Sequence, residues 1–170
     1  GAQPCQRSHA PIGDLERRFN RFEQFYEHLP SDASDLDNAA ALARRFDALF
    51  PEARSAEALA RLDAHDLRLL ARAAEDLVTS GAARPEYLEV MQRSFAERER
   101  RGVATAADVD DLRRALLQAH RFDAARRLMA EHPDAGLAPL PAFRDNLPAS
   151  GYTRHTVWRV SPDGKTLSRE

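Results

Sequence analysis

A cysteine and a histidine lie four residues apart near the start of the chain. Thiolate and imidazole are ligands that zinc and copper accept, so Cys5 and His9 are candidates for a metal site, and Cys5 alone for a reactive thiol. Two ligands do not complete a metal site, and residues 1–13 around them lack hydrophobic periodicity and contain Pro4, Pro11 and Gly13. The alternative is therefore a flexible N-terminal arm with a free thiol.

Two groups of aspartates could supply oxygen ligands for a divalent cation. They are Asp32, Asp35 and Asp37, and Asp108, Asp110 and Asp111. Neither group has the glycine and ligand spacing of a calcium loop. Each also stands where a helix is expected to begin, and carboxylates are favoured there by the helix dipole alone. A structural role at the helix starts is the alternative to a cation site.

The remaining histidines give no catalytic pattern. They are scattered and form no His-Glu-x-x-His arrangement, and the chain has no Gly-x-Ser-x-Gly elbow and no glycine-rich phosphate loop. His28 and His132 are both expected near helix C-termini, where a partial positive charge is stabilising. These patterns predict no catalytic residue and no cofactor, so an enzyme is the less favoured class.

The composition excludes several other classes. Charged residues make up 31% of the 170-residue chain, yet the net charge is −2, so no basic field would attract nucleic acid. No apolar stretch approaches the length of a membrane span. Arginine supplies every cation except Lys165, which indicates a GC-rich, bacterial coding sequence. The first residues look like a cut end, which favours a periplasmic or secreted location over a cytoplasmic one.

Apolar residues at helical spacing predict successive amphipathic helices across residues 14–133. The expected helices cover residues 14–29, 34–50, 55–62, about 66–80 and 85–101. Asp14 and Ser34 are expected to cap the first two helices, and Pro85 occupies the favoured first position of a helix. Leu36 is expected on the inner face of the second helix. Gly81 and Gly102 stand where left-handed C-terminal caps are favoured.

Residues 105–133 predict a tight helical hairpin. Val109, Leu112 and Leu116 mark one helix, and the second pattern begins at Phe122, so only two residues separate them. So short a connection forces the two helices to fold back antiparallel. Thr105 and Asp108 match a capping box at the start of the hairpin.

This hairpin resembles a unit of the tetratricopeptide family, in which a large residue opens each face and a small alanine sets the helix crossing. The residues that carry the resemblance are Val109, Leu112, Leu116, Phe122, Ala125 and Met129. Arg113 stands where the family has a small residue, His120 where it usually has glycine, and Pro133 arrives a turn early. The resemblance implies peptide or protein binding on a concave face, with no cofactor and no catalytic residue.

The C-terminal part departs from the helical pattern. Residues 134–150 form an irregular, proline-rich segment, and residues 151–170 predict a β-hairpin around a Pro-Asp-Gly turn. Aromatic side chains are the candidates for partner binding. They are Phe25, Tyr87, Phe95 and Trp158. Phe25 lies off the main stripe of its helix, and the alternative to an exposed patch is a helix that is buried on two sides.

The sequence as a whole predicts a mainly α fold, in which antiparallel helical hairpins stack as a bundle or short solenoid and a C-terminal β-hairpin follows. The favoured function is a non-enzymatic scaffold module that binds a protein or peptide in a groove between the first and last helical pairs. One alternative is a helical accessory domain of a longer enzyme. The other is a metal-handling protein that uses Cys5 and His9. The partner and the oligomeric state stay open.

Overall fold

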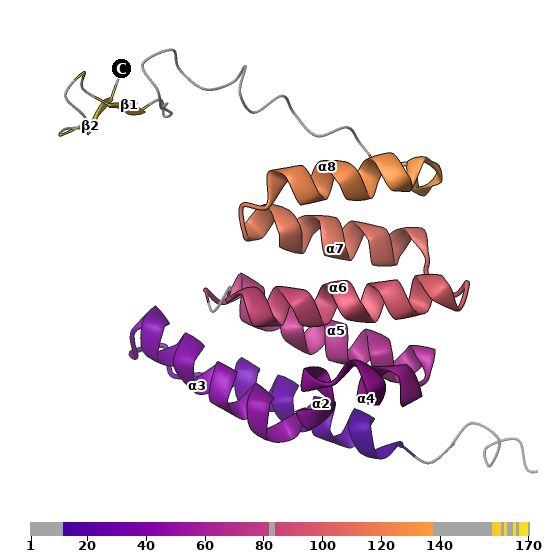
Figure 1. Ribbon diagram of the computed structural model, residues 1–170. Coiled ribbons are helices and arrows are strands. Elements are labelled where there is room, and N and C mark those ends of the chain that lie inside the picture. Colours follow the sequence, from indigo (N-terminus) through magenta and orange to yellow (C-terminus); the bar gives the residue numbers. More distant parts are fainter. Residues whose placement is uncertain are drawn as a thin grey trace, which may run out of the picture. The chain divides into compact units, whose positions relative to one another are not determined.

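A computed structural model describes residues 12–81, 84–137, 158–160, 162, 165 and 167–169. The described part is mainly α-helical and contains seven α-helices, as predicted (Figure 1). The chain divides into two compact units, residues 1–137 and residues 138–170. All of the described helices belong to the first unit.

The first two helices form a hairpin, and their N-termini are capped in different ways. Helix α2 covers Asp14–Glu27 and follows Gly13, which contributes no side-chain cap, so Asp14 is the first helical residue and not the cap that the sequence predicts. Helix α3 covers Asp35–Leu49, and the Ser34 hydroxyl accepts the Asp37 amide at 3.0 Å, as predicted.

The next elements pass from the first hairpin to the centre of the unit. A 3-10 turn η1 (Pro51–Arg54) and a short helix α4 (Ala56–Arg61) lead into α5 (Ala64–Thr79), whose cap is Asp63. Helix α6 covers Pro85–Arg100 and begins at the proline that the sequence places first. At its far end, the guanidinium of Arg101 donates to the carbonyls of Ala60 and Leu62, at 2.8 and 2.6 Å, and so satisfies the last turn of α4.

The last three elements of this unit begin with the predicted hairpin. Helix α7 covers Ala106–Gln118 and starts with the complete Thr105–Asp108 capping box. Helix α8 covers Phe122–Glu131, and the 3-10 turn η2 follows at Pro133–Ala135. The prediction of a tight helical hairpin is confirmed, with three residues between the two helices, 119–121, where the sequence predicts two.

Helices α6 and α7 end in the same hydrogen-bonded motif, with different residues in the left-handed position. After α6, Gly102 has a φ of +74° and the Val103 amide donates to the Arg98 carbonyl at 3.0 Å. After α7, His120 has a φ of +59° and the Arg121 amide donates to the Leu116 carbonyl at 2.8 Å. Both are Schellman caps, in which glycine is the residue of least strain. His120 therefore holds the tight α7–α8 turn in a conformation that its Cβ disfavours.

The helices stack in layers in chain order (Figure 1). Helices α2, α3 and α4 lie on one side of the α5–α6 pair, α7 packs on α6, and α8 packs on α7. The buried face of α5 is the centre of the core, and its residues from Leu67 to Val78 include six side chains that are less than 2% exposed. This arrangement makes α5–α6 the scaffold on which the outer hairpins are mounted.

An aromatic cluster joins the first hairpin to α6. The ring centroids of Phe22 and Phe46 are 5.9 Å apart, those of Phe46 and Phe50 are 5.1 Å apart, and Tyr87 packs edge-on against Phe46 at 5.4 Å. Edge-to-face and tilted pairs of this kind add to the free energy of area burial. Phe19 and Phe22 of α2 are thus core, whereas Tyr26 is half-buried and Phe25 is half-buried under the guanidinium of Arg45 at 5.2 Å.

In the second unit, the strands β1 (Trp158–Val160) and β2 (Leu167–Arg169) pair antiparallel, with Trp158 opposite Arg169 and Val160 opposite Leu167. The rest of the predicted β-hairpin and most of the proline-rich segment lie outside the described residues. The full hairpin over residues 151–170 therefore stays a prediction.

Several sequence-based bounds and one core assignment are corrected. Helix α2 ends at Glu27 and not at residue 29, and α5 begins at Ala64 and not at residue 66. Leu36 is 80% exposed because it lies in the first turn of α3, before the helix reaches the neighbours that cover Ala39 and Leu42.

Candidate functional site

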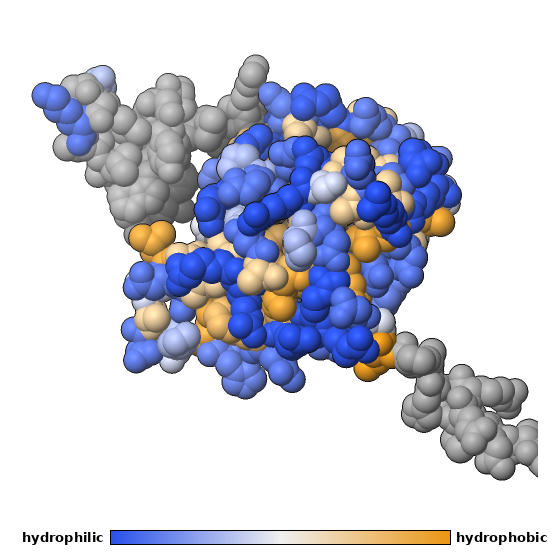
Figure 2. All heavy atoms as spheres, turned by 60° about the horizontal axis from the view of Figure 1, so that its bottom comes forward, coloured by the Kyte–Doolittle hydropathy of each residue, from blue (hydrophilic) through white to orange (hydrophobic). Residues whose placement is uncertain are grey.

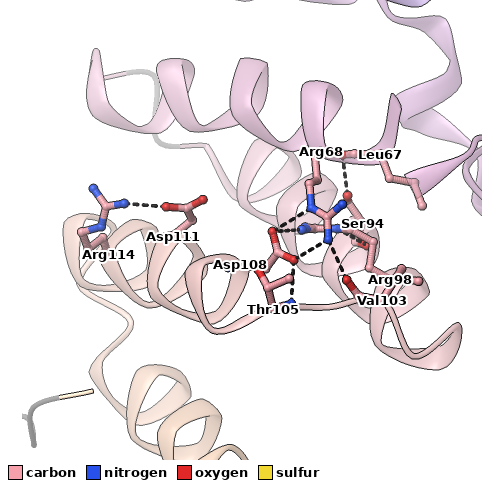
Figure 3. Close-up of polar contacts among 9 residues, drawn as sticks. All are labelled: Leu67, Arg68, Ser94, Arg98, Val103, Thr105, Asp108, Asp111 and Arg114. Carbon is pink, nitrogen blue, oxygen red and sulfur yellow. Dashed lines mark hydrogen bonds and ion pairs between the residues drawn. The ribbon is translucent and has the colours of Figure 1, made fainter. Parts of the chain in front are cut away.

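Two arginines share one buried carboxylate where α5, α6 and α7 meet (Figure 3). The guanidinium of Arg98 in α6 contacts Asp108 Oδ1 at 2.6 Å. Arg68 of α5 donates through Nε and Nη2 to the two oxygens of Asp108, at 3.1 and 3.0 Å. We call these three residues the Arg68–Asp108–Arg98 ion cluster. It links three helices through one side chain of α7.

Every group in this ion cluster is also tied to the backbone. The Thr105 amide donates to Asp108 Oδ2 at 2.8 Å, Arg68 donates to the Val103 carbonyl at 2.6 Å, and Arg98 Nε donates to the Ser94 carbonyl at 3.2 Å. The Ser94 hydroxyl in turn donates to the Leu67 carbonyl at 2.7 Å (Figure 3). This network fixes the register of α5 against α6 and the entry angle of α7.

The electrostatics of the ion cluster favour its ionised form. Burial acts to raise the pKa of Asp108, but hydrogen bonds from Arg68 and Thr105 and the charge of Arg98 together lower it below its ordinary value. Burial lowers the pKa of Arg98, and the charge of Asp108 opposes that effect. The cavity beside the cluster, about 180 Å³, is lined by arginines and carboxylates in equal number. The cluster thus resembles an internal ion pair more than a site for a charged ligand.

A hollow with an apolar floor lies between α3, η1 and α6. We call it the α3–α6 groove, a cavity of about 420 Å³ with Phe46, Phe50, Ala53, Tyr87 and Val90 as its floor. Its rim carries charges of both signs from Asp47, Arg54, Glu86, Glu89 and Arg93. An apolar floor inside a polar rim is the usual anatomy of a site that takes one apolar side chain of a partner.

The rim charges pair with one another along the surface. Arg54 contacts Asp47 at 3.5 Å, and Arg93 pairs with Glu89 one turn away on α6. Exposed pairs of this kind contribute little to stability, so their partners can be exchanged at small cost.

Apolar atoms also reach the surface between charged side chains on the face that carries α2, α3 and α4 (Figure 2).

The hydroxyl of Tyr87 is a polar group at the edge of the groove floor. Tyr87 donates to the carboxylate of Asp47 at 3.3 Å, and the guanidinium of Arg84 lies over its ring at 5.3 Å. Burial, followed by the charge of Asp47, raises the pKa of Tyr87 above its ordinary value. The hydroxyl therefore stays protonated and keeps donating to α3.

The structure places the four predicted partner-binding aromatics differently from one another. Tyr87 and Phe95 are only 2% and 4% exposed, so both rings are buried in the unit. Tyr87 also lines the α3–α6 groove, and the partner-binding role of the two residues stays a prediction. Their positions lie on the α6 face that packs on the rest of the unit. Phe25 is half-buried, as described above. The side chain of Trp158 lies outside the described residues.

The predicted cation candidates that the structure describes are not brought together as a metal site. Cys5 and His9 lie outside the described residues. Asp110 and Asp111 pair with arginines of their own helix, at 3.2 and 2.5 Å from Arg114, and Asp108 belongs to the ion cluster. Within residues 12–81 and 84–137, no three or more potential ligand side chains are grouped to hold a metal ion. No described helix is long and apolar enough to span a membrane.

The predicted groove between the first and last helical pairs is wrong. Helices α5 and α6 lie between those pairs, so the two cannot line one groove (Figure 1). The hollow instead forms between α3, η1 and α6, where Phe50 and Val90 line one space.

Sequence reasoning missed both the ion cluster and the groove. One signal was present for Arg98, because Met91, Phe95 and Arg98 follow helical spacing and so put an arginine on an apolar stripe. The sequence predicts Asp108 as a helix cap or as a cation ligand, and not as the shared partner of two arginines. The groove had no local signal, since its floor comes from three elements.

No family model, curated protein or solved structure matches the chain.

Proposed function

We propose that the helical unit is a protein- or peptide-binding module that docks an extended or helical segment of its partner in the α3–α6 groove. The observation that supports this proposal is the groove itself. Its aromatic and aliphatic floor can take one apolar side chain, and its rim offers carboxylates and guanidiniums to charges on either side.

The chemistry of the groove defines the partner. Its volume of about 420 Å³ lies in the lower part of the range for ligand pockets, which suits a single large side chain. The arginines Arg54 and Arg93 and the carboxylates Asp47 and Glu89 surround it. We therefore expect a segment with an apolar anchor and flanking charges of both signs.

The proposed resemblance to tetratricopeptide units is supported by the α7–α8 geometry. The two helices are antiparallel and joined by a tight turn, and Ala125 is fully buried at 0% exposure, as expected of a small residue at a helix crossing. The resemblance concerns this hairpin, whereas the groove lies at α3 and α6. The binding proposal therefore rests on the groove and not on the family.

The test is selection of peptides from a displayed random library on the purified protein. We expect enriched peptides to share one apolar anchor flanked by charges. Val90→Lys fills the groove and should abolish their binding, whereas Val103→Lys, which changes an exposed valine outside the groove, should leave it unchanged. Circular dichroism verifies that both variants are folded.

A second readout uses the unaltered protein. Addition of a selected peptide should shift the methyl resonances of Val90 and leave those of Val109, which is buried in α7, in place. Failure to enrich any peptide would contradict the proposal. So would peptides that bind wild type and Val90→Lys equally well.

A further inference from the structure

His132 is placed where both nitrogens of its ring face acceptors. Nδ1 lies 2.8 Å from the Leu128 carbonyl oxygen, and Nε2 contacts the carboxylate of Glu99 in α6. A carbonyl and a carboxylate each require an N–H, and a neutral imidazole has only one. Both contacts are satisfied together only when His132 is an imidazolium.

The same ring joins helices that are two layers apart. His132 is the C-terminal cap of α8, which packs mainly on α7, yet its ring lies edge-on against Phe95 of α6 with centroids 5.4 Å apart. A positive charge at the end of α8 also complements the helix dipole. His132 therefore holds the end of the outermost helix down on the scaffold.

We propose that His132 is a proton-operated latch, in which the imidazolium holds the end of α8 and η2 against α6 and its deprotonation releases them. Release uncovers the face of Phe95 and opens the cavity of about 380 Å³ between the end of α6, the start of α7 and η2. The inference is independent of the α3–α6 groove.

The carboxylates around the ring favour the proton. Glu99 comes from α6, Glu131 from α8 and Asp134 from η2, and the α7 residues at this cavity, Thr105, Ala106 and Val109, carry no charge. The cation near this contact is Arg98, which lies 5.9 Å from the centroid of the Phe95 ring and pairs with Asp108, a carboxylate that it shares with Arg68. Burial acts to lower the pKa of His132, and the contacts with Glu99 and the Leu128 carbonyl outweigh it, so the pKa is raised.

The sign of the pH effect follows. Because the folded pKa exceeds the unfolded value, the stabilisation from His132 is complete below the ordinary histidine pKa and is lost as pH rises through the raised one. The latch is thus closed at pH 6 and open at pH 9.

Hydrogen exchange of α8 amides at pH 6 and pH 9 tests the latch, with the amides of α5 as the internal reference. Every protein compared, including the wild type for His132, carries Asp76→Asn, because the pKa of Asp76 in α5 is raised to about 8 and its titration would change the protection of α5 in the same pH interval. We expect the protection of α8 relative to α5 to fall about fivefold from pH 6 to pH 9. In His132→Gln this relative protection should be low and equal at both pH values. Glu99→Gln should lessen the fall while leaving the fold intact.

The matched control is His65→Gln. His65 also contacts a glutamate, Glu16 at 2.6 Å, but joins α5 to α2, so the fall in α8 should stay as in wild type. Equal relative protection at both pH values in wild type would overturn the proposal, as would a fall that persists in His132→Gln.

A direct measurement covers the case in which His132→Gln does not fold. The ring ¹⁵N shifts of His132 in the wild-type protein should show both nitrogens protonated at pH 6 and a titration midpoint above the ordinary value of about 6.5. A neutral ring at pH 6 would overturn the latch.

Discussion

At the scale of single residues, Asp108 combines two structural roles in one buried carboxylate. Its side chain is 7% exposed, and it serves both as the capping-box carboxylate of α7 and as the shared partner of Arg68 and Arg98. Removal of a buried carboxylate leaves its partners as uncompensated charges, and that penalty exceeds the net stabilisation from the intact pairs. Removal of Asp108 should therefore cost more stability than its intact ion pairs contribute.

Asp108→Asn should lower the free energy of unfolding by about 3 kcal/mol, since Arg98 stays buried without a counter-charge. Urea denaturation monitored by circular dichroism measures this loss. Asp111→Asn is the matched control, because Asp111 pairs with Arg114 at the surface and should change stability by less than about 0.5 kcal/mol. Equal losses in the two variants would show that the buried ion cluster has no special role.

At the scale of elements, the contact between α2 and α5 contains two carboxyl groups that share a hydrogen bond. Burial, then the hydrogen bond with Glu23 and the charges of Glu23 and Glu75, raise the pKa of Asp76 to about 8. One oxygen of Asp76 is buried without a hydrogen-bond partner among the described residues. The packing of the first hairpin on the scaffold is therefore weakest when Asp76 is ionised.

The free energy of unfolding should consequently fall as pH rises from about 5 to 8, by up to about 1.4 kcal/mol per pH unit from this group. The folded state holds the Asp76 proton in that interval and the unfolded state does not. Asp76→Asn keeps the hydrogen bond without the charge, so it should flatten this pH dependence and exceed wild type in stability at pH 8. Urea denaturation at pH 5, 6.5 and 8 measures both effects.

Asp123→Asn is the control for this series, because Asp123 pairs with Arg126 at the surface and belongs to neither α2 nor α5. It should keep the wild-type slope. If Asp76→Asn also keeps that slope, Asp76 is not the titrating group.

At the scale of the whole molecule, the helical unit has its own core. The described buried apolar residues run from Leu15 to Leu128, within the compact unit of residues 1–137. A unit with a complete core of this kind can fold without the chain that follows it. The candidate groove and the latch both lie within this unit.

A chain cut after Leu137 should therefore unfold in one cooperative transition, at a midpoint within about 3 °C of the full chain. Thermal denaturation followed at the helical circular dichroism band compares the two. A broad transition, or a midpoint lowered by much more than this, would mean that residues 138–170 contribute to the helical core.

The sequence by itself determined the elements of the helical unit. Apolar side chains at spacings of three and four, Ser34 and Thr105 before their helices, Pro85 at a helix start and Gly102 after a helix end are all local signals, and each acts within one or two turns. This is why the seven helices and the tight α7–α8 hairpin were predictable.

Only the tertiary structure decided how these helices meet. Asp108 looks like a cap until Arg68 and Arg98 approach from two other helices, 40 and 10 residues away along the chain. The sequence does not decide whether Tyr87 and Phe95 face a partner or the core. The position of α6 at the centre of the unit buries both side chains. Charge pairing, burial and a groove floor each require side chains from separate elements to meet at one point in space. Helical periodicity specifies which face of a helix is apolar, but it does not specify which element covers that face.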